Sequence, residues 1–299
     1  MSETTVAPAD ERVEVAPGVT LRVRRWQAPG RPFVLVHGLA SNARVWDGVA
    51  ARLAARGFGA YAVDLRGHGE SDRPDEGYDT ETAAADVAVL VELLGLDRPV
   101  LAGQSWGGNV VVELAARRPA LPHALGLIDG GWLHLADRFA TADEAWAALA
   151  PPRLPAIPLA EMRARLRRWH PDWPESGIEG TLGNFEEQPD GTARVRLTRD
   201  RHESILRSLW AHRPRELYPR IAAPVLLLPA GQRPPDGRPG TGRVAEAAAA
   251  LRRAEVRWYD GADHDLHAQH PARLAADLAD LTTTWPTAAG PDDTGGEPP

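Results

Sequence analysis

The sequence predicts an α/β fold in which a mostly parallel central sheet is flanked by helices and carries a mostly helical lid as an insertion. Two observations lead to this fold class. Short apolar runs, typical of strands buried on both faces, alternate with amphipathic helical segments up to about residue 130 and again from residue 225. Between these parts, about 85 residues rich in Trp, Arg and Pro contain helical stretches and no clear strand. An insertion at one edge of such a sheet usually lies over the carboxyl ends of the strands, where ligands bind.

The first two strands are expected to form an antiparallel hairpin, because residues 11–15 and 21–26 alternate with period two around a Pro-Gly turn. The later strands are short and uniformly apolar, and the helices between them are amphipathic and commonly end at a glycine. The remaining predicted strands cover residues 32–36, 60–63, 100–102, 125–128, 225–228 and 256–259, and the predicted helices cover 42–56, 79–94, 105–118, 163–169, 201–210, 243–253 and 271–284. This organisation predicts a core of residues 11–131 and 220–285, a lid of residues 132–219, a flexible tail at 1–10 and a disordered, Pro- and Gly-rich tail at 286–299.

The composition excludes several kinds of chemistry. The 299 residues are 43% hydrophobic and 25% charged, which is enough for a packed core. A net charge of −7 argues against nucleic acid and against an electrostatic membrane anchor. The absence of cysteine excludes thiol catalysis, and the absence of lysine excludes Schiff-base chemistry. No apolar run approaches 18 residues and the first ten residues are polar, so we expect a cytoplasmic protein, monomeric or homodimeric, that acts on a small molecule.

One motif carries a candidate nucleophile. Gly103-Gln104-Ser105-Trp106-Gly107 follows a predicted buried strand and opens a helix, which is the context that a G-x-S-x-G turn requires. Such a turn exposes the Ser105 hydroxyl at the tip of the strand, and the amides at the start of the helix can stabilise negative charge. The alternative is a serine that only caps the helix.

Two further motifs close neighbouring strands, His37-Gly38-Leu39 and the stretch Asp64-Leu65-Arg66-Gly67-His68-Gly69-Glu70-Ser71-Asp72. In this order and context, the three motifs resemble the α/β-hydrolase superfamily from about residue 11 to residue 284, and the insertion matches that family's lid. The resemblance implies a nucleophile at Ser105 and an oxyanion hole made by the backbone amides of Leu39 and Trp106. We expect His37, Arg66 and His68 to be scaffolding of loops and turns.

The resemblance also implies a general base at His264, because the family's histidine lies in a G-x-x-H stretch after the last strand. His267 and His270 follow three and six residues later. Their spacing matches no zinc motif, so we expect them to pack or hydrogen-bond at the start of the last helix, and we expect no metal and no cofactor.

The acid that orients the histidine is less clear. In many relatives it follows the strand at 225–228, but the corresponding position here is Pro234, which cannot orient an imidazole. Asp236 lies two residues further in a Pro-rich loop, and Asp129 ends the strand at 125–128. We favour Asp129 because the end of a strand is the more rigid mount, and Asp236 remains the alternative.

These residues predict a cofactor-independent serine hydrolase acting on an ester, lactone or thioester of a small or medium apolar substrate. A serine nucleophile argues against epoxide opening and halide removal, which relatives perform with a carboxylate. Trp132 and His134 are candidate substrate-binding residues because they follow the end of a strand, and the Trp106 ring is a second aromatic candidate for the pocket. The alternatives are a C–C hydrolase or lyase of secondary metabolism and a ligand-binding protein without catalysis.

Overall fold

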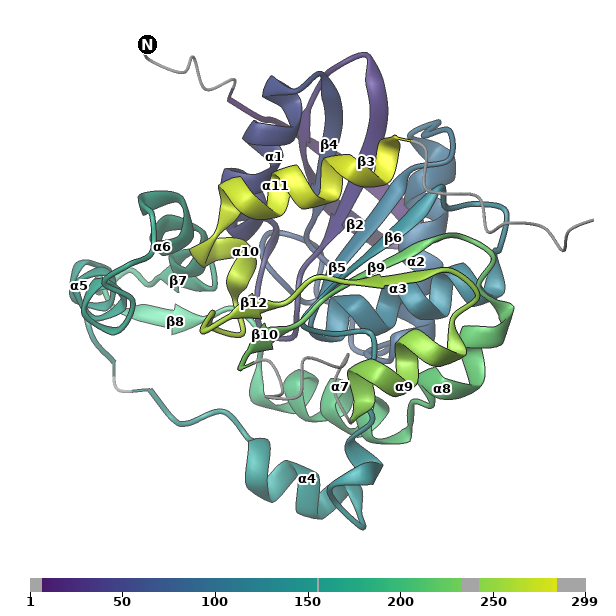
Figure 1. Ribbon diagram of the computed structural model, residues 1–299. Helices are drawn as coiled ribbons and strands as arrows, with labels where there is room; N and C mark the ends of the chain where they lie inside the picture. Colours follow the sequence, from purple (N-terminus) through teal and green to yellow (C-terminus); the bar gives the residue numbers. More distant parts are fainter. Residues whose placement is uncertain (1–6, 155, 233–241, 284–299) are drawn as a thin grey trace, which may run out of the picture.

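The computed structural model describes residues 7–154, 156–232 and 242–283. Within these residues, eight strands form one sheet in the order β1-β2-β4-β3-β5-β6-β9-β11 (Figure 1). The strands are β1 Ala9–Ala16, β2 Val19–Trp26, β3 Gly30–Val36, β4 Phe58–Val63, β5 Val100–Gln104, β6 Ala124–Ile128, β9 Val225–Leu228 and β11 Ala254–Val256. Strands β1, β2 and β4 pair antiparallel and all other pairs are parallel. The α/β fold with a mostly parallel sheet is therefore confirmed.

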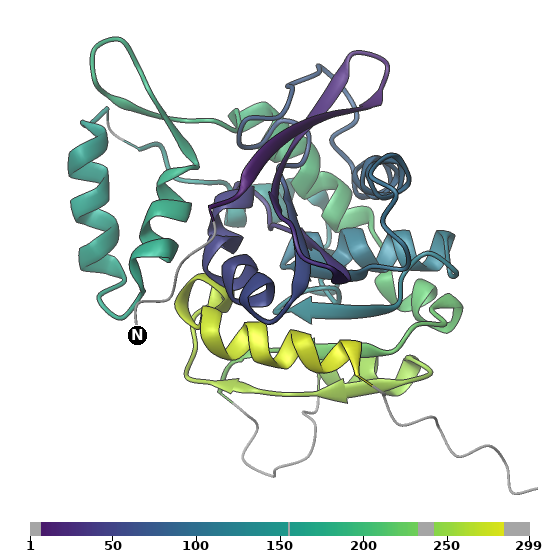
Figure 2. The same ribbon diagram turned by 90° about the horizontal axis from the view of Figure 1, so that it is seen from above.

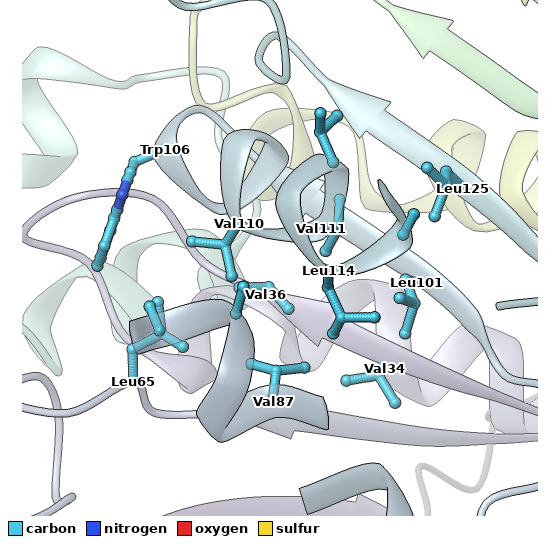
Figure 3. Packing of buried hydrophobic residues seen from close by; sticks show 14 of the residues in the cluster. Val34, Val36, Leu65, Val87, Leu101, Trp106, Val110, Val111, Leu114 and Leu125 are labelled. Carbon is cyan, nitrogen blue, oxygen red and sulfur yellow. The ribbon is translucent and has the colours of Figure 1, made fainter. Parts of the chain in front are cut away.

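Helices cover both faces of this sheet (Figures 1 and 2). The helices of the core are α1 Asp47–Ala55, α2 Thr80–Leu93, α3 Trp106–Arg117, α9 Arg243–Ala250, α10 Leu266–Gln269 and α11 Pro271–Ala279. Successive residues of a strand point to opposite faces, so Val34 and Val36 pack with α2 and α3. Their neighbours Phe33 and Leu35 pack with α1 and α11 on the other face. Figure 3 shows the first of these layers, in which side chains from β3, β5, α2 and α3 interdigitate.

The insertion, residues 132–219, is mostly helical but also contains a short hairpin. Its elements are α4 Ala142–Leu149, α5 Leu159–Trp169, α6 Glu175–Leu182, β7 Phe185–Glu187, β8 Ala193–Val195, α7 Arg199–Ala211 and α8 Pro214–Leu217. The expectation that this stretch has no strand is wrong at β7 and β8, which pair antiparallel over three residues each. Strands this short carry too little alternation to be recognised in a sequence.

Two other boundaries differ from the expectation. Strand β1 begins at Ala9, inside the stretch expected to be a tail, because its first residues pair with the end of β2. The single strand expected at 256–259 is divided between β11 and β12 Tyr259–Asp260, which pairs with β10 Ala230–Gly231. The neighbouring strand is divided in the same way, because Pro229, which has no amide hydrogen to donate, separates β9 from β10. Residues 1–6 and the tail at 286–299 lie outside the described residues.

Within the described segments, every helix is too short or too polar to cross a lipid bilayer.

Candidate active site

The turn between β5 and α3 holds Ser105 in a strained backbone conformation. Its φ is 53° and its ψ is −121°, a region that residues with a side chain rarely adopt. Glycines make the turn possible because a Cβ atom at Gly103 would lie 2.2 Å from the carbonyl oxygen of Gly107, and one at Gly107 would lie 2.4 Å from that of Val36. The side chain of Ser105 makes no capping hydrogen bond to α3, which argues against the capping interpretation of this serine.

The loop after β3 faces this turn. A Cβ atom at Gly38 would lie 2.3 Å from the side-chain oxygen of Gln104 and 3.1 Å from Cβ of Ser105, so only glycine allows the loop to approach so closely. Leu39 follows in this loop, and Trp106 is the first residue of α3, a position whose amide has no acceptor within the helix. The two amides expected to form the oxyanion hole therefore belong to segments that lie against each other beside Ser105.

Buried histidines hold this loop in place. His68 Nε2 accepts a hydrogen bond of 3.2 Å from the amide of Ala40, a residue with a φ of 60°. His37 Nε2 accepts a bond of 3.1 Å from the amide of Leu65. Burial lowers the pKa of His37 to about 4 and that of His68 to about 3, so both rings are neutral. Arg66 pairs with buried Asp86, and the scaffolding expected of all three residues is confirmed.

Asp129 and His264 are in direct contact. His264 Nδ1 lies 2.5 Å from Oδ2 of Asp129, and Oδ1 of Asp129 accepts a bond of 3.1 Å from the amide of Ala230. Asp129 follows β6 and has a φ of 39°, so the end of the strand and the amide together fix the carboxylate. A Cβ atom at Gly130 would lie 2.1 Å from the carbonyl oxygen of Ser105, which places the Asp129 loop directly against the serine turn.

The surroundings of His264 favour its protonated form. Burial acts to lower the pKa of His264, but the hydrogen bond to Asp129 and the negative charges of Asp265 and Asp129 outweigh it and raise the pKa above 6.5. Burial also raises the pKa of Asp265, against the charge of His264. The ring therefore has the electrostatic support that a base needs when it takes up a proton.

A cavity of ≈180 Å³ joins these groups. It is lined by Leu39, Ala40, Ser41, Val45, Gln104, Ser105, Thr181, Asn184, His264, Asp265, His267 and Ala268. Ser105 and His264 line the same space, although no hydrogen bond joins their side chains among the described residues. Thr181 and Asn184 come from the insertion, so the insertion closes one side of the cavity.

Two positioning residues were not predicted from the sequence. Gln104 Nε2 donates to the backbone oxygen of His264 at 3.2 Å and so links the serine turn to the histidine loop. Fully buried Asn109, on α3, accepts from the amides of Gly131 and Leu133 and donates to the Leu133 oxygen at 2.7 Å. For Gln104, the one signal in the sequence was its position inside the G-x-S-x-G motif. Nothing in the sequence pattern marks Asn109.

The candidate substrate-binding residues of the sequence lie elsewhere. Trp132 belongs to the same buried apolar layer as the side chains of α2 and α3. His134 Nδ1 lies 3.0 Å from the carboxylate of Asp137. Neither residue is among those that line the cavity beside Ser105. The indole of Trp106 points into the apolar layer and donates to the Thr80 hydroxyl at 3.1 Å (Figure 3). Asp236 lies outside the described residues. In the parts of the chain that the structure describes, no three His, Asp or Glu side chains are grouped so as to hold a metal ion.

The chain matches the Alpha/beta hydrolase family over residues 33–277. The AB hydrolase superfamily protein YisY of Bacillus subtilis is 43% identical over 88 residues, which are 29% of this chain and 33% of that protein. The stretches shared with YisY and with three mycobacterial proteins span only 33% to 44% of those relatives' lengths.

Two solved structures share the fold across almost the whole chain. E-2-(acetamidomethylene)succinate hydrolase superposes with a TM-score of 0.76 at 24% identity, covering 92% of this chain and 98% of that one. The thioesterase domain from the curacin biosynthetic pathway superposes with a TM-score of 0.74 at 22% identity, covering 92% and 100%. With the family match over most of its length and the motifs in their order, the chain belongs to the α/β-hydrolase family.

Proposed function

We propose that this protein is a cofactor-independent serine hydrolase that cleaves an ester, lactone or thioester of a small or medium apolar substrate. The observation that carries the proposal is the 2.5 Å contact between Asp129 and His264, made where His264 and Ser105 line one cavity. A carboxylate on Nδ1 leaves Nε2 of the imidazole unprotonated and free to act as a base toward a hydroxyl.

The proposed reaction uses these groups in two steps. Ser105 Oγ attacks the carbonyl carbon while His264 takes its proton, and the amides of Leu39 and Trp106 stabilise the oxyanion. The intermediate collapses as His264 returns the proton to the leaving group, which leaves an acyl group on Ser105. Water activated by His264 then releases the acid and restores the serine.

A second and larger cavity supports an apolar substrate. It measures ≈600 Å³ and is lined mainly by the insertion, by apolar side chains such as Pro151, Leu154 and Leu197 and also by the three arginines Arg153, Arg194 and Arg199. Ala40 lines both cavities, so the larger space begins next to the oxyanion loop. An apolar chain on one side of the scissile bond would bury its surface there.

Hydrolysis of short- and medium-chain p-nitrophenyl esters tests this function, with Ser105→Ala as the matched variant and a fluorophosphonate as a covalent label. We expect turnover and labelling by the unaltered protein and neither by Ser105→Ala. Labelling without ester turnover would favour the C–C hydrolase or lyase alternative. Absence of both would overturn the hydrolase and favour a ligand-binding protein.

A further inference from the structure

The larger cavity, of ≈600 Å³, has a lining with two contrasting parts. Leu154 is 40% exposed and Val195 is 37% exposed, so two of the five large apolar side chains that the described residues leave exposed lie in this one cavity. A ligand with an apolar chain would cover them. The apolar part of the lining includes Pro151, Pro152, Leu154, Ala156, Val195 and Leu197.

The other part of the lining is basic. Arg153, Arg194 and Arg199 line the cavity, and no Asp or Glu is among its described lining residues, in a chain with a net charge of −7. The carboxylates that neighbour lining residues in the sequence, such as Asp190 and Asp200, do not line it. This local excess of positive charge favours an anionic ligand.

One of the three arginines is already paired. Arg194 donates through Nε and Nη2 to Oε1 of Glu186, at 3.0 and 2.5 Å. Arg153 and Arg199, in contrast, have no carboxylate partner among the described residues. An anion in the cavity would therefore meet the charges of Arg153 and Arg199.

Arg199 is held next to the segment that contains Arg153. Its Nη1 donates to the carbonyl oxygen of Pro151 at 2.8 Å, two residues before Arg153. Its guanidinium group also lies 4.6 Å from the centroid of the Trp146 ring, which fixes it at the wall of the cavity. Like charges at one wall repel each other, so a bound anion would offset an unfavourable interaction.

His202 adds a neutral donor to the same wall. It lies three residues after Arg199 on α7, lines the cavity, and has its ring 6.1 Å from that of Trp146. Burial, followed by the charge of Arg199, lowers the pKa of His202 to about 4, so the ring is neutral. The ring is partly exposed, has no hydrogen-bond partner among the described residues, and has neither nitrogen among the sealed, unpaired atoms. A ligand can therefore accept a hydrogen bond from it.

We propose that the larger cavity binds an apolar chain that ends in a carboxylate, and that Arg153, Arg199 and His202 recognise the carboxylate. A guanidinium group suits this role because its planar donors match the two oxygens of a carboxylate. The site needs no passage to the smaller cavity beside Ser105. The ligand is a separate carboxylic acid or the far end of the ester substrate, and only the second assignment rests on the proposed function.

Calorimetric titration of the protein with octanoate, 1-octanol and acetate tests the site. We expect octanoate to bind at least about tenfold more tightly than the other two, because octanol lacks the charge and acetate lacks the chain. Arg153→Met, which keeps the apolar stem and removes the charge, should weaken octanoate binding about tenfold and leave octanol binding nearly unchanged. Arg153 is exposed and has no partner among the described residues, so this replacement spares the fold.

Arg168→Met is the matched control. Arg168 lies on α5 of the same insertion, is likewise exposed and without a partner among the described residues, and does not line the cavity. It should leave octanoate binding unchanged. Octanoate that binds no more tightly than octanol, an affinity that survives both Arg153→Met and Arg199→Met, or an equal loss in Arg168→Met would overturn the site.

A pair of esters identifies the source of the carboxylate. The mono-p-nitrophenyl ester of octanedioic acid has a carboxylate at the end of its chain, and p-nitrophenyl octanoate has a methyl group there. A higher kcat/KM for the first ester that Arg153→Met removes would support the site and make its ligand the far end of the substrate. Octanoate binding that depends on Arg153, without this preference, would support the site and make its ligand a separate molecule.

The same measurements separate this inference from the proposed function. Octanoate binding that depends on Arg153, in a protein that cleaves no ester and takes no fluorophosphonate label, would support the site and overturn the hydrolase. Ester turnover without octanoate binding would support the hydrolase and overturn the site.

Discussion

At the scale of single residues, the site concentrates backbone strain. Ala40, Ser105 and Asp129 all have positive φ angles although none is a glycine, and they lie in the loop after β3, in the serine turn and in the loop after β6. Such conformations persist only where the surrounding contacts enforce them. Here the contacts are the Ala40 amide on His68, the glycines around Ser105 and the Ala230 amide on Asp129.

The pH dependence belongs to this scale. The proposed base must be neutral to accept a proton, and the pKa of His264 is raised above 6.5 in the folded protein. Activity should therefore fall as the pH decreases through a midpoint above 6.5. Asp265→Asn removes one of the charges that raise this pKa and should move the midpoint of kcat/KM to lower pH.

The profile is measured with an ester that the unaltered protein cleaves, with Asp263→Asn as the control. Asp263 is an exposed neighbour that bonds the Trp173 indole, so its replacement should leave the midpoint in place. A midpoint that stays or rises in Asp265→Asn would contradict the electrostatic account.

At the scale of elements, α3 organises two parts of the site. Its first turn follows Ser105, and one turn later Asn109 binds the chain at Gly131 and Leu133, just after Asp129. Asn109 Nδ2 also donates to His212 Nδ1, and His212 Nε2 in turn donates to Glu113 on the same helix. The helix that begins after Ser105 therefore also fixes the loop that follows Asp129.

Asn109→Leu keeps the size of the side chain and removes its hydrogen bonds. Because Gly131 and Leu133 would be left unpaired in a buried place, we expect a loss of about 1–3 kcal/mol in the free energy of unfolding. We also expect a lower kcat with little change in KM, because the acid moves while the cavity stays. Denaturant unfolding and steady-state kinetics measure the two effects. Asn109→Asp retains the acceptor, so its stability and its kcat should lie between those of the unaltered protein and of Asn109→Leu. A normal kcat in Asn109→Leu would show that Asn109 does not position Asp129.

At the scale of the whole molecule, the core and the insertion meet beside the cavity. Buried Asn42, in the loop after β3, donates to the Gly180 oxygen at 2.8 Å and to Asn184 at 2.6 Å. Thr181 and Asn184 line the cavity, so this junction also shapes the place where substrate would bind. Arg73 and Glu186 form a second link between the two parts at 3.2 Å, but at a partly exposed position.

We expect the Asn42 link to contribute more to the free energy of unfolding and to KM than the link between Arg73 and Glu186. Asn42→Ala should lower the free energy of unfolding by about 1–3 kcal/mol and raise KM, because it leaves buried groups unpaired and releases Asn184. Arg73→Ala should cost at most about 1 kcal/mol, as exposed ion pairs usually do, and leave KM unchanged. Thermal or denaturant unfolding with Michaelis kinetics tests this ranking, and the reverse order would refute it.

The sequence predicted the parts that depend on local pattern. The core strands are uniformly apolar and the serine turn has its glycines in order, so the sheet and the placement of Ser105 at a strand end followed directly. His264 and Asp129 lie 135 positions apart, and their contact was expected from the order of the motifs and the rigidity of a strand end. The role of Asp129 as the acid stays a prediction that this contact supports.

The remaining features depend on contacts between distant segments. In the sequence, Asn109 is one polar residue in an apolar helix. Only the folded structure shows that it accepts hydrogen bonds from the amides of Gly131 and Leu133. His267 was expected to pack or hydrogen-bond; its ring packs on that of Trp46, and its two ring nitrogens have no hydrogen-bond partner among the described residues. Both effects arise from tertiary packing, which no spacing in the sequence encodes.

The most direct measurement of the central claim is kcat for Asp129→Asn, beside Asp236→Asn, on an ester that the unaltered protein cleaves. If Asp129 holds His264 as the base of a serine hydrolase, Asp129→Asn should lower kcat by about 10³- to 10⁴-fold, and Asp236→Asn should stay close to the unaltered protein. An Asp129→Asn protein with nearly normal kcat, above all if Asp236→Asn loses activity, would contradict the account.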